Sequence, residues 1–390
     1  METLESVFKA MSDFLWGPPL IILMVGGGLF FLVLSRALPY RHFGHAFAIL
    51  RGRYDDPSHP GDITHFQALC AALSGTLGLG NIAGVAFAVS YGGPSAVFWM
   101  WITALVGVAT KFFTCTLSIM YRGRDSLGDI QGGPMYMIRE GLGRKWLPLA
   151  FFFCIAALVG TLPIFQINQL TEAVREAVLL REGVINEAQA GTFNLWFGIL
   201  IAAIVGVVIF GGIQRVGATA ARLVPAMVVV YLACAVVILA INAPAVPGAI
   251  ASIFTHAFTA DLSGMAAGGF MGVIITGVRQ GAFSNEAGIG TEVMAHGAAQ
   301  TDEPVREGLV AMMGPVIDTL IVCTLTALVL LATGTWQAGS DVAGAALTAR
   351  AFGESLGVFG PWIIMVLIVV FSMSTMFTFW YYGAKALGFM

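Results

Sequence analysis

The chain has 390 residues, of which 58% are hydrophobic and 11% are charged, and its formal net charge is −3. A soluble domain carries roughly a quarter charged residues, so this composition excludes an ordinary soluble protein and indicates a chain that lies mostly in lipid. The near-neutral charge argues against a nucleic-acid partner. The five cysteines lie in apolar stretches, where they are more typical of small core residues than of a disulfide framework.

Long apolar runs follow one another along the chain, without the period-two alternation of a membrane barrel. A helix crosses the hydrocarbon core in about 20 residues. The runs therefore predict an all-α polytopic membrane protein, a single transmembrane domain over residues 1–390 with about nine spans. The expected ranges are 16–37, 66–90, 94–120, 147–170, 194–211, 220–242, 263–297, 306–334 and 358–387.

Lysine and arginine predict the orientation, because cytoplasmic loops accumulate positive charge. Basic residues crowd the loops after the first and third spans, at residues 36–53 and 122–145. With these loops in the cytoplasm, the amino terminus lies outside and the carboxyl terminus of this chain lies inside. We expect a multi-pass protein of the cell (inner) membrane.

Two of the expected spans are interrupted in the middle. The second contains "SGTLGLGNIAG" (residues 74–84) and the seventh contains "SNEAGIG" (residues 284–290). Glycine costs a helix interior about 1 kcal/mol relative to alanine, and irregular backbone at membrane depth is tolerated only where it is buried in protein or lines a cavity. Close packing of small residues would explain one such stretch. Two stretches at matching positions favour a binding site.

The positions of the two breaks indicate inverted repeats. The second and seventh spans cross the membrane in opposite directions, as in transporters whose halves are related by an axis in the membrane plane. The first repeat is expected at about residues 62–242 and an incomplete second repeat at about 263–390, with the first span outside both. Unwound helix ends would expose carbonyl groups to a cation and amide groups to a carboxylate.

These stretches resemble the sodium:alanine (alanine or glycine:cation) symporter family. The segments that carry the resemblance are "FQALCAALSGTLGLGNIAGVA", "GGPSAVFWMWITALVGVATKF", "GGPMYMI", "GVRQGAFSNEAGIGTEVMAHGAAQTDEPVREGLV" and "IDTLIVCTLTALV". The resemblance implies a leucine-transporter-type inverted-repeat fold with discontinuous helices. It also implies sodium-coupled import of a small neutral amino acid, alanine with glycine or serine as alternatives, by alternating access.

The resemblance further implies which residues bind the substrate and the ion. The substrate-binding residues it implies are Gly75, Thr76, Gly80, Gln166, Phe283, Ser284 and Asn285. The sodium-binding residues it implies are Ser74, Leu77, Asn81, Ser374 and Thr375. Sodium is the expected coupling ion, and no other metal and no cofactor are expected. Carbonyl and hydroxyl oxygens suit sodium without burying a charge.

Several ionisable residues lie inside the expected spans, where such groups are functional by default. Arg279 and Glu286 could instead pair as a structural bridge, and Asp318 could hydrogen-bond the ends of the broken helices. Glu286 and Glu292 leave a proton-coupled amino-acid transporter open as an alternative function.

The chain departs from the family's pattern in three places. Thr114 stands where the family usually has a glutamate, and Thr291 and Glu292 stand where it favours small residues and proline. The second repeat ends after its third helix, so that the last two helices of the architecture are expected to be missing and the chain to be a fragment of a longer protein.

Other functions remain open at this point. They are a channel or a substrate-sensing receptor on the same scaffold, and an inactive fragment of a transporter. An enzyme is not expected, because the spans show no nucleophile–base pair and no metal-ligand cluster. The choice of amino acid and the oligomeric state are left undetermined.

Overall fold

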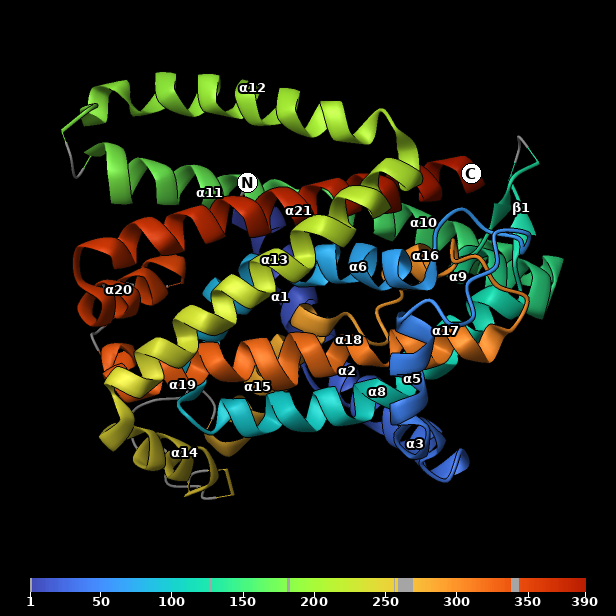
Figure 1. The fold of residues 1–390 in the computed structure, drawn as a ribbon, viewed down its shortest axis with the longest axis horizontal. Helices are drawn as coiled ribbons and strands as arrows, with labels where there is room; N and C mark the ends of the chain where they lie inside the picture. The colour runs from blue at the N-terminus through green and yellow to red at the C-terminus, as the bar shows by residue number, and fades with distance from the viewer. Residues whose placement is uncertain (1, 126–127, 181–182, 256, 259–268, 338–343) are drawn as a thin grey trace.

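The computed structural model describes residues 2–125, 128–180, 183–255, 257–258, 269–337 and 344–390. These residues form helices joined by short turns, together with one small antiparallel ribbon of β1 (Gly123–Arg124) and β2 (Ile130–Gln131). In Figure 1 the long helices lie across the molecule, and most of the short elements gather at its two ends.

The helices follow one another along almost the whole described chain. Up to residue 255 they are α1 (Glu2–Leu15), α2 (Pro18–Ile21), α3 (Gly27–Leu34), α4 (Leu38–Arg41), α5 (Phe43–Leu50), α6 (His65–Thr76), η2 (Gly80–Gly84), α7 (Val85–Gly92), α8 (Ala96–Met120), α9 (Pro134–Tyr136), α10 (Leu147–Gly160), α11 (Ile164–Val174), α12 (Ala190–Ile209), α13 (Gly212–Ile241) and α14 (Val246–Thr255). The later ones are α15 (Gly269–Asn285), α16 (Val293–His296), α17 (Pro304–Ala311), α18 (Met313–Pro315), η8 (Val316–Cys323), α19 (Thr324–Thr333), α20 (Ala345–Leu356) and α21 (Gly360–Phe389).

The helical segments agree with most of the expected spans. In the described part of the chain, seven helices are long and apolar enough to cross a membrane, and the bent pair of α6 with residues 80–92 raises this to as many as eight. The expected seventh span, 263–297, begins outside the described residues and continues as α15, an irregular segment and α16. The sequence did not predict α14 or α20, which are too short to span a membrane.

The first expected break is confirmed. Helix α6 begins with a capping box, in which the side chains of Thr64 and Gln67 each accept a hydrogen bond from the other residue's backbone N–H. It ends at Thr76, and the chain resumes its helix at Gly80 after a bend of 53°. At Gly78 a Cβ atom would lie 2.5 Å from the Thr375 hydroxyl. The bare backbone therefore lets α21 approach the unwound turn.

The second expected break is also confirmed. After α15 ends at Asn285, the backbone takes left-handed conformations at Glu286 (φ 55°), Gly288 (φ 89°) and Gly290 (φ 96°). Two of these positions are glycines, which adopt positive φ without steric cost. Glu286 has a Cβ atom, so its backbone is strained, and such strain persists only where the surrounding structure enforces it.

Helix α8 lies at the centre of the packing, because 67% of its apolar window is buried against 6% for the peripheral α12. Helices α3, α15 and α17 pack against it. Small residues allow the close approach: a Cβ atom on Gly277 would collide with the Ala96 carbonyl oxygen, and one on Gly28 would lie 2.7 Å from the Val106 carbonyl oxygen. The first span, outside both expected repeats, thus covers one side of α8.

We predict that Gly277→Ala lowers the thermal unfolding midpoint of the purified protein, because its methyl group would press on a backbone atom that cannot rotate away. Overpacking of this kind typically costs about 1–3 kcal/mol. The matched control is Gly198→Ala in α12, where a new Cβ atom has nothing within 4 Å. An equal effect of the two substitutions would contradict the close contact of α15 with α8.

Candidate functional site

A cavity of about 340 Å³ lies beside the first break. The end of α6 contributes Gly75 and Thr76 to its wall, and the helix that resumes after the break contributes Gly80. Helix α11 contributes Gln166, and α15 contributes Phe283. These are five of the seven residues expected at the substrate. Its other lining residues are Trp16, Gly78, Leu79, Phe153, Ala156, Ala157, Gly160, Thr161, Leu162, Phe165, Glu286, Ile289, Thr291, Thr375 and Phe379.

The other two expected substrate residues do not line this cavity. The Ser284 hydroxyl donates to the Asp318 carboxylate at 2.7 Å, and the Asn285 amide donates to the Thr319 hydroxyl at 3.1 Å. Both side chains are fully buried behind the cavity wall. They follow Phe283 on the helix, where each residue turns by about 100°, so adjacent residues face different neighbours.

Aromatic side chains close one side of the cavity. The Phe283 ring meets the Phe165 ring edge-on, with centroids 6.2 Å apart, and the Trp16 ring at 6.5 Å. The Arg279 guanidinium lies over the Trp16 ring, 5.2 Å from its centroid. Among the described residues no ion pair joins Arg279 to Glu286. Of the two roles left open for Glu286, the structural bridge to Arg279 is not formed, and a cation–π contact with Trp16 takes the place of that ion pair.

Oxygen atoms from α6 and α21 meet at the first break. The Ser74 hydroxyl donates to the Ser374 carbonyl at 2.7 Å, and the Ser374 hydroxyl lies 3.5 Å from the Ser74 carbonyl. The Thr375 hydroxyl stands against Gly78 and lines the cavity. Leu77 has ψ 93°, so its carbonyl leaves the helical direction. Four of the five residues expected at sodium are thus neighbours, and all are buried.

Asn81, the fifth, takes part in a different set of contacts. Its Oδ1 accepts from the Gly78 N–H at 2.9 Å, and its Nδ2 donates to Asp318 Oδ1 at 2.5 Å. Asp318 also accepts from Ser284 and Thr319, so its buried carboxylate connects the two breaks through side chains of both. This confirms the expectation that Asp318 hydrogen-bonds the broken helices. We call Asn81, Ser284, Asp318 and Thr319 the Asp318 cluster.

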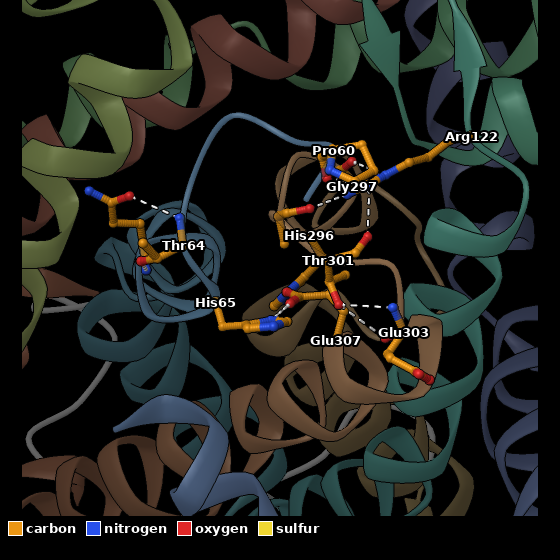
Figure 2. A network of polar contacts seen from close by, with 11 residues as sticks. Pro60, Thr64, His65, Arg122, His296, Gly297, Thr301, Glu303 and Glu307 are labelled. Carbon is orange, nitrogen blue, oxygen red and sulfur yellow. Dashed lines mark hydrogen bonds and ion pairs between the residues drawn. The ribbon is translucent and has the colours of Figure 1, made fainter. Parts of the chain in front are cut away.

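A second buried network joins the broken helices at their other ends, as Figure 2 shows. Glu307 of α17 accepts from both His65 at the start of α6 and His296 at the end of α16, the latter at 2.5 Å. Nearby, the Arg122 guanidinium donates to the carbonyls of Pro60 at 2.9 Å and Gly297 at 3.0 Å. No sequence pattern predicted this network, because its histidines have no metal-ligand spacing and lie far apart in the chain.

An acidic cavity of about 650 Å³ opens near the same end. Asp62, Asp125, Asp129 and Lys385 are among its lining residues. Burial raises the pKa of Asp62, which precedes α6, above its usual value. The Lys385 ammonium donates to the Met294 carbonyl at 3.0 Å. This hydrogen bond joins α21 to α16, the short helix that follows the second break.

Comparison with known proteins identifies the family. A family model with the description "Sodium:alanine symporter family" matches residues 1–390 of the chain. The chain belongs to this family. It is therefore a multi-pass membrane protein of a family of sodium-coupled amino-acid symporters. Members of this family are transporters and not enzymes.

Individual relatives agree with this assignment. The chain is 40% identical over 393 residues to an uncharacterized transporter of Haemophilus influenzae, covering 98% of this chain and 82% of the relative. It is 37% identical to the sodium/alanine symporter AgcS of Methanococcus maripaludis, covering 99% of this chain and 83% of AgcS. It is 33% identical to the "Probable sodium/glutamine symporter GlnT" of Bacillus subtilis, covering 100% of this chain and 78% of that protein.

A solved structure shows the fold. The chain resembles MhsT in complex with L-phenylalanine with a TM-score of 0.54 at 14% identity, over 85% of this chain and 78% of MhsT. At this identity the likeness concerns the fold alone. It confirms the expected leucine-transporter-type, all-helical architecture with a bent helix pair.

We predict that Glu307→Gln lowers the thermal stability of the symporter. The glutamine amide has one acceptor oxygen for two buried histidine N–H groups, and a buried donor without an acceptor costs about 1–3 kcal/mol. The control is Glu354→Gln, which breaks the exposed 2.7 Å pair with Arg350 and should cost under about 1 kcal/mol. The measurement is the thermal unfolding midpoint of each variant in detergent. Equal midpoints for the two variants would contradict a stabilising role for the network.

Proposed function

We propose that this symporter imports a small neutral amino acid, with alanine as the first candidate, together with sodium by alternating access. The proposal rests above all on one observation: oxygen atoms of α6 and α21 face each other at the first break, directly beside a cavity of amino-acid size. A coupled transporter needs its ion and its substrate to stabilise the same arrangement of helices.

Sodium would bind between the carbonyls of Ser74 and Leu77 and the hydroxyls of Ser374 and Thr375. The carbonyl end of α6 carries the negative end of the helix dipole, which attracts a cation. Thr375 belongs to the cavity wall as well, so the ion and the amino acid would share a side chain. Asn81 would hold the unwound turn in place through the Gly78 N–H and act on the ion indirectly.

The amino acid would bind as a zwitterion in the cavity. Its carboxylate would face the amide end of the helix that restarts at Gly80, where the helix dipole is positive. The described lining residues include one carboxylate, Glu286, and no lysine or arginine. Glu286 would therefore receive the ammonium group, together with the buried Gln166 Oε1, which has no hydrogen-bond partner among the described residues.

The cavity size bears on the choice of amino acid. Its 340 Å³ equals about eleven waters at about 30 Å³ each, which is more than the six non-hydrogen atoms of alanine fill. Glycine, alanine and serine would fit with water, and glutamine would fit more completely. The name of the relative GlnT makes glutamine the competitor to test beside alanine.

The arrangement in the membrane is part of the same proposal. The first repeat would run over about residues 62–242 and the second over about 263–390, with the amino terminus outside the cell membrane. The acidic cavity around Asp62 would then lie on the cytoplasmic side, where a released cation leaves.

Uptake of radiolabelled alanine into proteoliposomes tests this function. An inward sodium gradient should drive accumulation above equilibrium, and replacement of sodium by choline should abolish it. Unlabelled glutamine, glycine and serine serve as competitors. Uptake that is unchanged in choline at constant pH would favour the proton-coupled alternative, and uptake that never exceeds equilibrium would favour a channel.

We predict that Thr375→Val raises the sodium concentration for half-maximal uptake by about tenfold or more, because the isosteric methyl group removes one oxygen ligand worth about 1.4 kcal/mol. Thr255→Val is the control, since that exposed hydroxyl donates to the Ala251 carbonyl within α14, away from the break. The sodium dependence of initial rates is the measurement. A Thr375→Val protein with unaltered sodium dependence would rule the hydroxyl out as a ligand.

A further inference from the structure

Glu292 is the feature of the second break that the proposed ion and substrate sites leave unexplained. It lies between Gly290 and α16, and its side chain is 0% exposed. Neither carboxylate oxygen accepts a hydrogen bond from a side chain in the part of the chain that the structure describes, and the donors nearest to it are the backbone N–H groups of Gly290 and of Glu292 itself. An ionised carboxylate without partners is very costly in a low-dielectric interior, and such a group takes up a proton instead.

The other buried carboxylates of the described residues are all satisfied. Asp318 accepts from Asn81, Ser284 and Thr319. Glu286 accepts from the Thr291 hydroxyl at 2.5 Å and lines the cavity, and Glu307 is shared by two histidines. Each of them has donors that stabilise a negative charge. Glu292 is fully buried as well, but no side chain of the described residues donates a hydrogen bond to it.

The charged groups around Glu292 act on it in opposite directions: the Lys111 ammonium favours a negative charge there, and the Glu286 carboxylate opposes it. Four ionisable groups interact electrostatically with Glu292: Lys111 and Cys115 of α8, Glu286 of the second break, and Tyr382 of α21. No ion pair within 4 Å joins Lys111 to Glu292 in the described part of the chain. The single ammonium group of Lys111 is also within electrostatic reach of Glu286 and Asp318.

The chemistry of the site favours a proton over a metal ion. The described residues hold no group of three histidine, cysteine, aspartate or glutamate side chains that could bind a metal. Tyr382 offers a buried hydroxyl, itself a donor, that has no partner within the described ranges. A protonated carboxyl needs far fewer ligands than a cation does.

We propose that Glu292 is a proton-binding site, separate from the sodium and amino-acid sites. The carboxylate takes up one proton from water before the broken helices close over it, which gives a neutral carboxyl group. It returns the proton to water when the half-helix α16 separates from α21 and the site opens. The proposal rests on the transport function proposed above, which supplies the opening and closing.

Infrared spectroscopy tests the protonation directly and without any transport. The purified protein at neutral pH should show the C=O stretch of a protonated carboxyl, and Glu292→Gln should remove the intensity of one such group. Glu292→Ala, which puts a small residue at this position as the family favours, serves as a second variant if the glutamine variant does not fold. Glu354→Gln is the control and should leave the band unchanged. A band of undiminished intensity in both Glu292 variants would overturn the proposal.

The pH dependence of uptake tests whether the proton takes part in transport. Sodium-driven alanine uptake by the unmodified protein should fall by about tenfold per pH unit above its midpoint, as for one proton. Uptake by Glu292→Gln, which mimics the protonated carboxyl, should change by less than about twofold over the same range. Identical profiles for the two proteins would contradict the role in transport. Absence of sodium-driven uptake in the unmodified protein would instead count against the proposed function and leave the infrared result standing.

Discussion

Peptide groups in the membrane interior must find partners inside the protein, and this constraint governs the structure around the two breaks. The unwound turn after α6 is supported by Asn81, which accepts from the Gly78 N–H. The end of α15 is supported by Asn285, which accepts from the Ala287 N–H at 3.0 Å. The Asp318 carboxylate then joins the two breaks through buried hydrogen bonds from Asn81 and Ser284. Broken helices are stable in this protein because polar side chains replace the missing helical bonds.

The same support shapes the proposed ion and substrate sites. The side chains of the Asp318 cluster bind one face of each break, which leaves the opposite face open toward α21 and the cavity. On that face a carbonyl end and an amide end of two helix segments lie close together. Opposite helix dipoles attract opposite charges, so one short segment can serve both a cation and a carboxylate. The network at Glu307 fixes the far ends of the same helices, and alternating access requires such units to move as rigid bodies.

The sequence predicted the features of the structure that depend on local chemistry. The glycines around Gly78 and Gly288 predicted both breaks, and the apolar runs predicted the long helices. The resemblance to a family named residues that the structure brings together at the first break, such as Ser74 and Ser374, which lie 300 residues apart. Whether these residues bind sodium stays a prediction.

Other features depend on tertiary contacts that no local pattern reveals. Ser284 and Asn285 were expected in the pocket with Phe283, but the rotation of α15 is set by its packing on α8 and turns them toward Asp318 and Thr319. A pair between Arg279 and Glu286 was one alternative from the sequence, but Arg279 lies over Trp16 of the first span instead.

We propose that the opposed oxygens of α6 and α21 form the ion site and that the adjoining cavity holds the amino acid. The most direct measurement is a crystal structure of the symporter with alanine and thallium(I), a monovalent stand-in for sodium with strong anomalous scattering. We expect an anomalous peak among Ser74, Leu77, Ser374 and Thr375, and alanine density beside Glu286 and Gln166. A peak at the Asp318 carboxylate with no density between α6 and α21, or alanine bound outside the cavity, would contradict it.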